Sequence, residues 1–448
     1  MKPTKDIIIA GAGLVGSLLS IYLAKKGHKV RVFERRPDSR KAKIYQGRSI
    51  NLALSNRGWR ALDGVGVGTE IKKFAIPMYR RVMHDAKGKL SFQPYGKDGE
   101  AIYSVSRALL NQRLLDIAEE MPEVSLQFER RCVGVDLDGA KLDLEDPNGK
   151  RLEVKGDFVF GSDGAFSVVR SAMERTDRFN YEQEYIDHGY KELSIPAGPD
   201  GSFLMEKEAL HIWPRGEHML IALPNPDGTF TCTLFFPYEG NPSFSSLKGL
   251  TEARAFFEEV FPDALALMPN FDEEWTNNPN SSLCIIRCYP WVKGNMALIG
   301  DSAHAIVPFY GQGMNSGFED CRILDKILDE EESWENAMER YQKERKGNGD
   351  AIAELAMRNF IEMRDLTADK DFLLRKRIEA KVAERHPQTW IPLYSMVTFS
   401  HIPYETALQI GKIQDRIMKE VMSRPDIEQM WDSPEVEVAI LEAVQRYL

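Results

Sequence analysis

The sequence predicts an α/β protein: a discontinuous α/β domain, an antiparallel-sheet domain inserted into it, and a helical C-terminal region. Three observations support this fold class. A strand, a glycine-rich turn, a helix and a second strand follow one another at the N-terminus. Apolar and polar residues alternate over short strands between residues 170 and 280, as in "HMLIALP" and "GTFTCTLFFPY". From residue 331 onward the periodicity is helical, with few strands.

The N-terminal segment "DIIIAGAGLVGSLLSIYLAKKGHKVRVFER" predicts a Rossmann-like βαβ unit that binds a dinucleotide. Gly11 permits the tight turn, Gly13 lets the backbone approach a pyrophosphate, and Gly16 lets the helix pack closely on the strand. Glu34 ends the second strand, where an acid accepts hydrogen bonds from an adenosine ribose. Its charge disfavours a ribose 2′-phosphate, whereas the two arginines that follow attract one. FAD and NAD both remain open at this point.

A second glycine-rich turn, in "NMALIGDSAHAIVPFYGQGMNSGFEDC", favours FAD. A strand ends at Asp301, and a helix is expected to begin near Met314 after a proline and two glycines. NAD needs no second helix N-terminus, whereas FAD has a ribityl chain and an isoalloxazine ring beyond its pyrophosphate. Asp301 can accept hydrogen bonds from ribityl hydroxyls, and the amides of the helix start can polarise the flavin pyrimidine. A third turn, with Asp163, lies in "FVFGSDGAFSVVR".

Three such turns, near residues 11, 163 and 301, resemble those of the para-hydroxybenzoate hydroxylase type of flavoprotein monooxygenase, the class A FAD-dependent aromatic hydroxylases. The resemblance covers the chain from the first strand to about residue 410. Within this class it is most specific to one branch, whose substrate is an aromatic amino acid. The segments that narrow it are "GRSINLALSNRGWRAL", "YSVSRALLNQRLL", "PFYGQGMNSGFEDC", "RNFIEMRD" and "IPLYSMVTFS". It implies non-covalently bound FAD, NADPH as co-substrate, and O2-dependent hydroxylation of the ring beside an amino group.

The class also implies the domain organisation and the location of the chemistry. The expected segments are 1–70, 100–170 and 280–330 for the FAD-binding domain, 70–100 and 170–280 for the substrate domain, and 331–448 for a helical region that closes the substrate site. In this class a flavin C4a-hydroperoxide delivers the oxygen, so we expect no catalytic side chain. The protein orients the substrate and excludes water. We therefore expect His304 to be structural, bridging within its turn.

The resemblance assigns substrate residues at both ends of the chain. Arg81 and Tyr95 correspond to a clamp for the substrate carboxylate, because an arginine fork matches a carboxylate and a phenol adds one donor. Without the resemblance they would be a solvated arginine beside a turn tyrosine. The other residues carried over are Asn359 and Tyr394 as polar partners, Met363 one turn after Asn359, and Phe309, Tyr310, Phe235 and its neighbour Phe236 as walls around the aromatic ring.

The cofactor residues are assigned in the same way. Those at the adenosine end are Gly11, Gly13, Gly16, Glu34 and Arg36. The others are Arg107 at the pyrophosphate or ribityl chain, Ala53 near the flavin, Asp301 at the ribityl chain, Met314 and Asn315 at the helix start, and Asp163 in a turn that serves FAD or NADPH.

Composition sets the remaining expectations. A formal net charge of −10 argues against a nucleic-acid binder. Five scattered cysteines and no apolar signal segment predict a reducing cytoplasm. Cys284 and Cys288 lack the companions of a metal site, so no metal is expected. No run of eighteen apolar residues occurs, so no membrane span is expected, although mitochondrial members of the branch carry one. A monomer and a homodimer are both compatible with the sequence.

Two other functions remain open on the sequence alone. The first is a single-component FAD hydroxylase that acts on another aromatic acid or a phenol. The second is a flavoprotein that binds or stores electrons without hydroxylating anything. A dehydrogenase using only a nicotinamide cofactor would leave the turn at Asp301 without a use.

Overall fold

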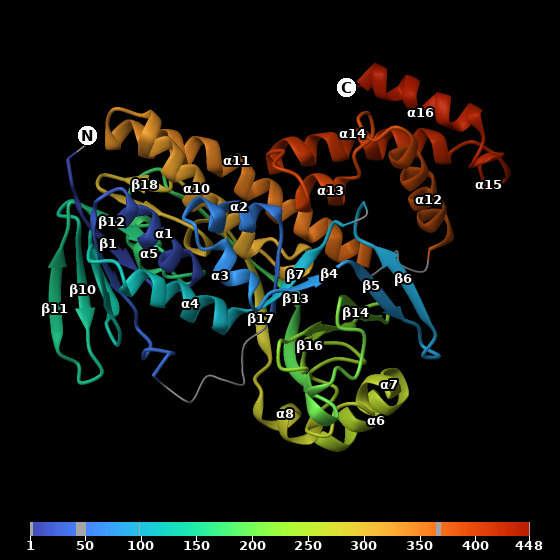
Figure 1. Ribbon diagram of the computed structural model, residues 1–448, viewed down its shortest axis with the longest axis horizontal. Coiled ribbons are helices and arrows are strands. Elements are labelled where there is room, and N and C mark those ends of the chain that lie inside the picture. Colours follow the sequence, from blue (N-terminus) through green and yellow to red (C-terminus); the bar gives the residue numbers. More distant parts are fainter. Residues whose placement is uncertain (1–2, 42–50, 98, 364–368, 448) are drawn as a thin grey trace.

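The computed structural model describes residues 3–41, 51–97, 99–363 and 369–447. Parts of two quoted segments, residues 47–50 and 364–365, lie outside these ranges. The predicted fold class is confirmed: a mixed α/β body is joined to an antiparallel sheet and to a group of C-terminal helices (Figure 1).

A six-stranded sheet forms the centre of the α/β body, in the order β18-β19-β12-β1-β2-β8. All its neighbours are parallel except β18 and β19. The strands are β1 (Asp6–Ala10), β2 (Lys29–Phe33), β8 (Val124–Gln127), β12 (Phe158–Gly161), β18 (Val292–Lys293) and β19 (Met296–Leu298). The helices packed around the sheet are α1 (Leu14–Lys25), α4 (Arg107–Glu119), α5 (Val168–Met173), α9 (Asp301–His304) and α10 (Gly313–Glu330).

The register of this sheet places the three predicted turns together. Ala10 of β1 is opposite Gly161 of β12, and Gly161 is opposite Leu298 of β19. The carboxyl ends of these three parallel strands therefore lie at one edge of the sheet, and each leads directly into one of the turns. Ligands of open α/β sheets bind at this edge.

Two small sheets accompany the body. One is antiparallel and contains β9 (Arg131–Asp136), β10 (Lys141–Glu145) and β11 (Arg151–Lys155), visible at the far left of Figure 1. The other contains β3 (Asn51–Leu54), β4 (Ile76–Met78) and β7 (Ile102–Ser106), and it lies where the body meets the large antiparallel sheet. The helices α2 (Asn56–Gly64) and α3 (Gly68–Lys72) follow β3.

The seven-stranded sheet has the order β17-β13-β16-β15-β14-β5-β6. Its strands are β5 (Arg80–His84), β6 (Leu90–Pro94), β13 (Asn180–Ile195), β14 (Ala209–Pro214), β15 (Met219–Pro224), β16 (Phe230–Pro237) and β17 (Ser281–Tyr289). Only β14 and β5 pair in parallel. One face packs on α6 (Leu250–Val260), α7 (Pro262–Leu265) and α8 (Phe271–Asn277) through a core rich in phenylalanine. Strand β17 belongs to this sheet although it lies within the segment 280–330.

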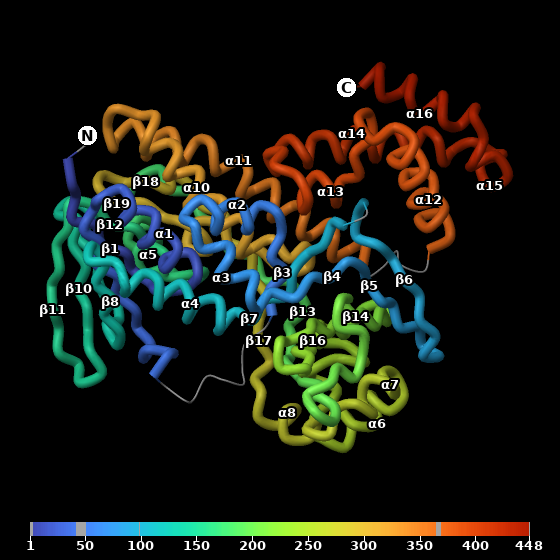
Figure 2. Tube along the Cα trace, in the orientation of Figure 1, coloured from blue at the N-terminus to red at the C-terminus, as the bar shows by residue number. Residues whose placement is uncertain are grey.

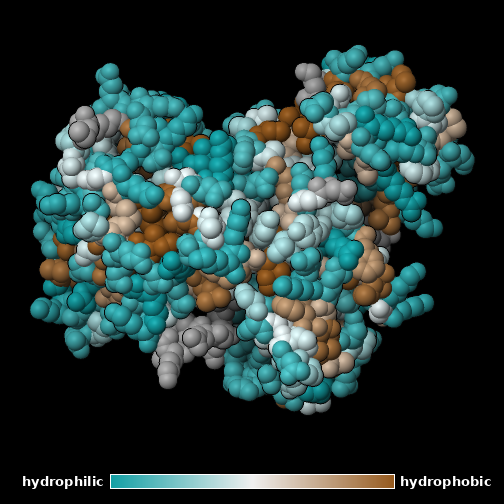
Figure 3. Space-filling view, viewed as in Figure 1, coloured by the Kyte–Doolittle hydropathy of each residue, from teal (hydrophilic) through white to brown (hydrophobic). Residues whose placement is uncertain are grey.

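The C-terminal part is helical, as predicted. It contains α11 (Trp334–Ile361), α12 (Lys370–Arg385), α13 (Leu393–Thr398), α14 (Tyr404–Met422), α15 (Ile427–Met430) and α16 (Pro434–Tyr447). In Figure 2, α11 runs from the α/β body toward the group formed by the last helices. Figure 3 shows hydrophilic residues over most of one face of the molecule, with hydrophobic residues in separate patches. Within the described ranges, no helix has both the length and the apolar character needed to cross a bilayer.

Candidate active site

The first turn contains two glycines that admit no side chain. Gly11 has φ +102°, and a Cβ there would lie 2.4 Å from the carbonyl oxygen of Ser162. A Cβ on Gly16 would lie 2.0 Å from the carbonyl oxygen of Gly11. At Gly13, which precedes α1, a Cβ would meet no protein atom within 4 Å, and no side chain caps this helix. The first N–H groups of α1 therefore face open space, which suits a pyrophosphate.

The predicted adenosine-end residues lie beside this turn. The Glu34 carboxylate accepts hydrogen bonds from the N–H groups of Ala12 (2.9 Å) and Arg36 (3.0 Å), which fixes it next to the glycines. Arg36 is exposed. Arg107, also exposed, is the first residue of α4, and Asn111 one turn later donates to the Ala12 carbonyl at 3.2 Å. The start of α4 is thereby held close to the first turn of α1.

The second and third turns are hydrogen-bonded to each other. Asp163 accepts from the hydroxyls of Ser167 (2.5 Å) and Ser302 (3.2 Å) and from the N–H of Val168 (2.7 Å). Its carboxylate therefore caps α5 and ties the two turns together, so any contribution to a cofactor comes through the position of the backbone. Asp301 is exposed, and its carboxylate makes no hydrogen bond or ion pair with any residue in the described ranges. It remains free to accept from a ligand.

The start of α10 lies against β3, as the prediction of Ala53 and Asn315 requires. The Asn315 side chain donates to the carbonyls of Ala53 and Gly311, both at 2.8 Å, and accepts from the N–H of Ser55 at 2.9 Å. No side chain caps α10, so its first N–H groups, near Met314, are available to a ligand.

The residues described above fit a bound flavin dinucleotide. Gly13 leaves room for a close approach of the backbone, and two helix N-termini without side-chain caps, those of α1 and α10, supply N–H donors. A free carboxylate, Asp301, follows strand β19, whose carboxyl end lies at the same edge of the sheet. When bound there, FAD would supply the redox and oxygen chemistry, which no protein side chain carries.

The predicted carboxylate clamp forms a compact cluster. The guanidinium carbon of Arg81 on β5 lies 4.6 Å from the ring centroid of Tyr95 and 4.7 Å from that of Tyr394 on α13. The rings of Tyr95 and Tyr394 are stacked, with centroids 5.7 Å apart, and Tyr310 stacks on Tyr394 at 5.4 Å. Residues from the two ends of the chain therefore share one stack.

This cluster holds a cation without an anion. Arg81 is partly buried and forms no ion pair with any acid in the described ranges. The Tyr95 hydroxyl is buried and has no hydrogen-bond partner there. Burial raises the pKa of both Tyr95 and Tyr394, so both phenols stay protonated and neutral. A buried charge and an unsatisfied hydroxyl are both costly, and a ligand carboxylate would satisfy both.

Aromatic walls lie next to the stack. The Phe235 and Phe309 rings are 4.9 Å apart, and Phe309 stacks on Phe360 at 4.2 Å. The Asn359 amide donates to the Phe309 carbonyl (2.7 Å) and contacts the Met363 sulfur (3.2 Å). These contacts join α11 to the short helix η3 (Pro308–Tyr310).

One expected wall residue points elsewhere. Phe236 follows Phe235 on β16, and successive side chains of a strand face opposite sides of the sheet. Phe236 packs on Phe256 and Phe244 in the core under α6 to α8, with ring centroids 5.2 Å apart in both pairs. The expectation for Phe236 was therefore wrong, for the physical reason that adjacent strand positions cannot line the same pocket.

The structure adds apolar residues that sequence reasoning missed. A small core cluster places Tyr95 and Tyr394 with Ala53, so it joins the clamp to the predicted flavin position. The other members of this cluster are Met78, Ile102, Leu210, Ile221, Leu223 and Phe399. The alternating pattern of "ALHIWPRG" and "HMLIALP" marks Leu210 and Ile221 as facing one side of the sheet, but only the pairing of β14 with β5 places Leu210 opposite Arg81.

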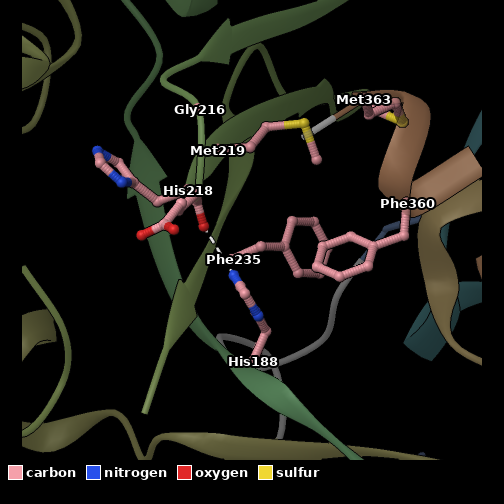
Figure 4. Close-up of a pocket in the computed structure, with 8 residues that line it drawn as sticks. His188, Gly216, His218, Met219, Phe235, Phe360 and Met363 are labelled. Atoms are coloured by element: carbon pink, nitrogen blue, oxygen red, sulfur yellow. Dashed lines mark hydrogen bonds between the residues drawn. The ribbon is translucent and has the colours of Figure 1, made fainter. Parts of the chain in front are cut away.

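A small cavity is lined by two of the predicted substrate residues, Phe235 and Met363, and by Phe360. Figure 4 shows Phe235 and Phe360 side by side, with Met219 and Met363 beside them and His188 hydrogen-bonded to a backbone carbonyl. The cavity measures about 10 Å³, room for about one water molecule. It is too small for an aromatic amino acid, so the clamp cluster is the better candidate for the substrate site.

His304 makes the structural contacts expected of it. Its Nε2 lies 2.6 Å from an Asp320 carboxylate oxygen, and its ring stacks on Trp291 at 5.1 Å. The bridge reaches helix α10 rather than staying within the turn.

Fold and site together define an FAD-dependent monooxygenase, and comparison with known proteins agrees. The chain matches the family described as "FAD binding domain" over residues 4–240 and 265–356. It is similar in fold to 2-methyl-3-hydroxypyridine-5-carboxylic acid oxygenase (TM-score 0.67, 20% identity, 83% of this chain and 95% of that one). A variant of Klebsiella pneumoniae HpxO complexed with FAD is also similar (TM-score 0.66, 18% identity, 85% and 96%).

Relatives with higher sequence identity show which family within this class the chain belongs to. Kynurenine 3-monooxygenases of Flavobacterium johnsoniae (51% identity) and Christiangramia forsetii (52%) match over 100% of both chains, and that of Dictyostelium discoideum (43%) matches over 94% of both. The chain belongs to the kynurenine 3-monooxygenase family. This is the branch that the segments quoted above resemble, so the narrower resemblance is confirmed.

Proposed function

We propose that this protein hydroxylates L-kynurenine to 3-hydroxykynurenine with NADPH and O2, using bound FAD. The reaction belongs to tryptophan degradation, on the route toward quinolinate and NAD. Kynurenine carries a carboxylate, an ammonium group and an aromatic amine, so a site for it must hold two opposite charges at one end and an apolar ring at the other.

The observation that carries the proposal is the unpaired cation of Arg81 between Tyr95 and Tyr394. A guanidinium binds a carboxylate bidentately. The neutral phenol of Tyr95, which lacks a partner among the described residues, can add one donor. Such a cluster is costly when empty and stabilised by a carboxylate ligand.

The substrate ammonium needs an acceptor near this clamp, and Glu362 is the candidate. Burial is the main reason that the pKa of Tyr310 is raised, and the negative charge of the Glu362 carboxylate adds to the rise, so Glu362 lies within electrostatic reach of the stack. Its ion pairs with Arg358 and Lys376 are long, at 3.9 and 3.8 Å. Glu362 is therefore the acid that we propose for the substrate ammonium.

The protein's own contribution to the reaction is to bind, orient and keep out water. Arg81 fixes the carboxylate, Phe235 and Phe309 confine the ring, and Tyr394 brings the helical C-terminal region over the site. The first N–H groups of α10 and the exposed Asp301 carboxylate would hold the flavin. No protein side chain needs to attack the substrate or abstract a proton for this assignment.

The test is steady-state NADPH oxidation under air, with and without L-kynurenine, followed by chromatography against a 3-hydroxykynurenine standard. We expect kynurenine to accelerate NADPH oxidation and to be converted to product that co-elutes with the standard. Parallel assays with 4-hydroxybenzoate and salicylate address the alternative aromatic acids. Acceleration by one of these, with no hydroxylated kynurenine, would contradict the proposal. NADH in place of NADPH tests the electron donor.

A further inference from the structure

Arg57 on α2 is almost fully buried, 1% exposed, and contacts three separate parts of the chain. Its Nε donates to the Val397 carbonyl at 3.0 Å, and Nη2 donates to the carbonyls of Met396 (3.4 Å) and Ile402. Its Nη1 pairs with the Glu319 carboxylate on α10 at 2.8 Å. One side chain therefore joins α2, α10 and the segment around α13.

The contacts with α13 are those of a helix cap. The last carbonyls of a helix have no partner within it, and a cation at that end is favoured by the helix dipole. The Asn56 amide donates to the Phe399 carbonyl at 2.9 Å. Asn56 and Arg57 thus hold the C-terminal end of the helix that carries Tyr394.

On its other side, Arg57 belongs to a balanced buried network. Arg345 on α11 pairs with Glu319 (2.9 Å) and with Asp320 (2.6 Å), and Asp320 also contacts His304 and the N–H of Gly300. Burial alone would raise the pKa of the Glu319 carboxyl. The positive charges of Arg345 and Arg57 lower this pKa by more than burial raises it, so the net shift is downward. The carboxylate is therefore ionised.

A second connection runs through Tyr404, the first residue of α14. Its ring lies 4.0 Å from the guanidinium carbon of Arg57, and its hydroxyl donates to the Gln312 side-chain oxygen at 2.9 Å. Gln312 is the residue that precedes α10, where the predicted flavin amides begin.

We propose that Arg57 is a positioning residue that fixes α13 relative to the start of α10, and so sets the distance between Tyr394 and the flavin site. Arg57 itself belongs to neither the clamp nor the predicted flavin contacts. The inference rests on the proposed function for its link to substrate, whereas the link between Arg57 and the segment 393–402 stands on the contacts alone.

The test compares Arg57→Lys with Arg60→Lys, a matched change at an exposed residue of the same helix. A lysine keeps the charge but has a single compact ammonium group instead of the planar fork with which Arg57 reaches the carbonyls and Glu319 in different directions. Three quantities are measured on FAD-loaded protein: the Kd for L-kynurenine, the peroxide formed per NADPH oxidised, and hydrogen exchange of the segment 393–402. In addition, the Kd for FAD is measured as a control for the cofactor site.

For Arg57→Lys we expect faster exchange in 393–402, a Kd for kynurenine raised about fivefold or more, a larger peroxide share, and a Kd for FAD within about twofold. Arg60→Lys should match the unmutated protein. Unchanged exchange in 393–402 together with an unchanged kynurenine Kd and peroxide share would overturn the proposal, even if the melting temperature falls.

Two further provisions allow the proposal to be tested even if the first variant does not fold or the protein is inactive on kynurenine. If Arg57→Lys does not fold, Tyr404→Phe removes only the bond to Gln312 and should show the same changes at smaller size, about two- to threefold in Kd; no change would count against the proposal. If the unmutated protein does not hydroxylate kynurenine, the proposed function fails, and the exchange measurement alone decides whether Arg57 holds α13.

Discussion

Replacement of Arg81 by alanine is the most direct perturbation of the clamp. In the structure Arg81 forms no ion pair with a described acid, so its loss leaves no buried carboxylate behind, and we expect the fold and the FAD content to be retained. What is lost is the partner of the substrate carboxylate. Charge-assisted hydrogen bonds contribute about 1.5 to 3 kcal/mol, which corresponds to roughly a ten- to hundredfold increase in the Kd for kynurenine. Because the guanidinium is partly buried and lies against the Tyr95 and Tyr394 rings, we expect the upper half of this range.

The assay is titration of the FAD-loaded protein with L-kynurenine, followed by the change in flavin absorbance or by calorimetry. The matched control is Arg80→Ala, the preceding residue on the same strand. Arg80 faces the opposite side, where it pairs with Glu206 at 2.7 Å and its side chain is 46% exposed. The control should keep its Kd within about twofold. If Arg81→Ala does the same, the clamp is wrongly assigned and the substrate itself comes into question.

Three further predictions follow from single contacts. Tyr394→Phe should weaken kynurenine binding by about 1 kcal/mol, a neutral hydrogen bond, and raise the peroxide formed per NADPH, measured with a peroxide-coupled assay; an unchanged ratio would argue against closure by this residue. Gly16→Ala should prevent FAD loading, measured by absorbance of the purified protein, because its Cβ would lie 2.0 Å from the Gly11 carbonyl oxygen; a fully yellow variant would refute this. Burial lowers the pKa of His211 and of His218 to about 4, from 6.5. The unfolded chain therefore takes up protons first, and stability should fall as the pH drops from about 6.5 toward 4, by up to about 3 kcal/mol for the buried His211. Urea unfolding across this range would show it, and a flat profile would contradict it.

The α/β part of the site could be predicted from the sequence because the sequence patterns that define it are local. Gly11 follows an apolar strand directly and Gly16 lies in the first turn of the next helix, and their steric role in the structure is the one that their spacing predicts. The strand expected to end at Asp301 ends at Leu298 instead, and Asp301 begins the short helix α9, yet this turn is as local as the first one and leads on to the uncapped start of α10. In both turns the residues that shape the site lie within a few positions of one another, so short-range pattern is sufficient.

The residues of the substrate site could not be predicted from local sequence patterns. Arg81, Tyr95 and Tyr394 come together because β5 pairs with β14 and because α13 packs on the body, and neither contact leaves a local pattern. Their assignment came from resemblance. Arg57 was missed altogether: in "SNRGWRAL" it reads as an ordinary surface residue of an amphipathic helix, and only the C-terminal segment packed over it makes it buried.

The order of the site residues along the chain has a consequence for how the molecule is made. Every predicted flavin contact lies before residue 316, whereas the stack needs Tyr394, and bringing Tyr95 and Tyr394 together closes a loop of roughly 300 residues. During synthesis the cofactor pocket can therefore be complete while the substrate pocket still lacks a wall.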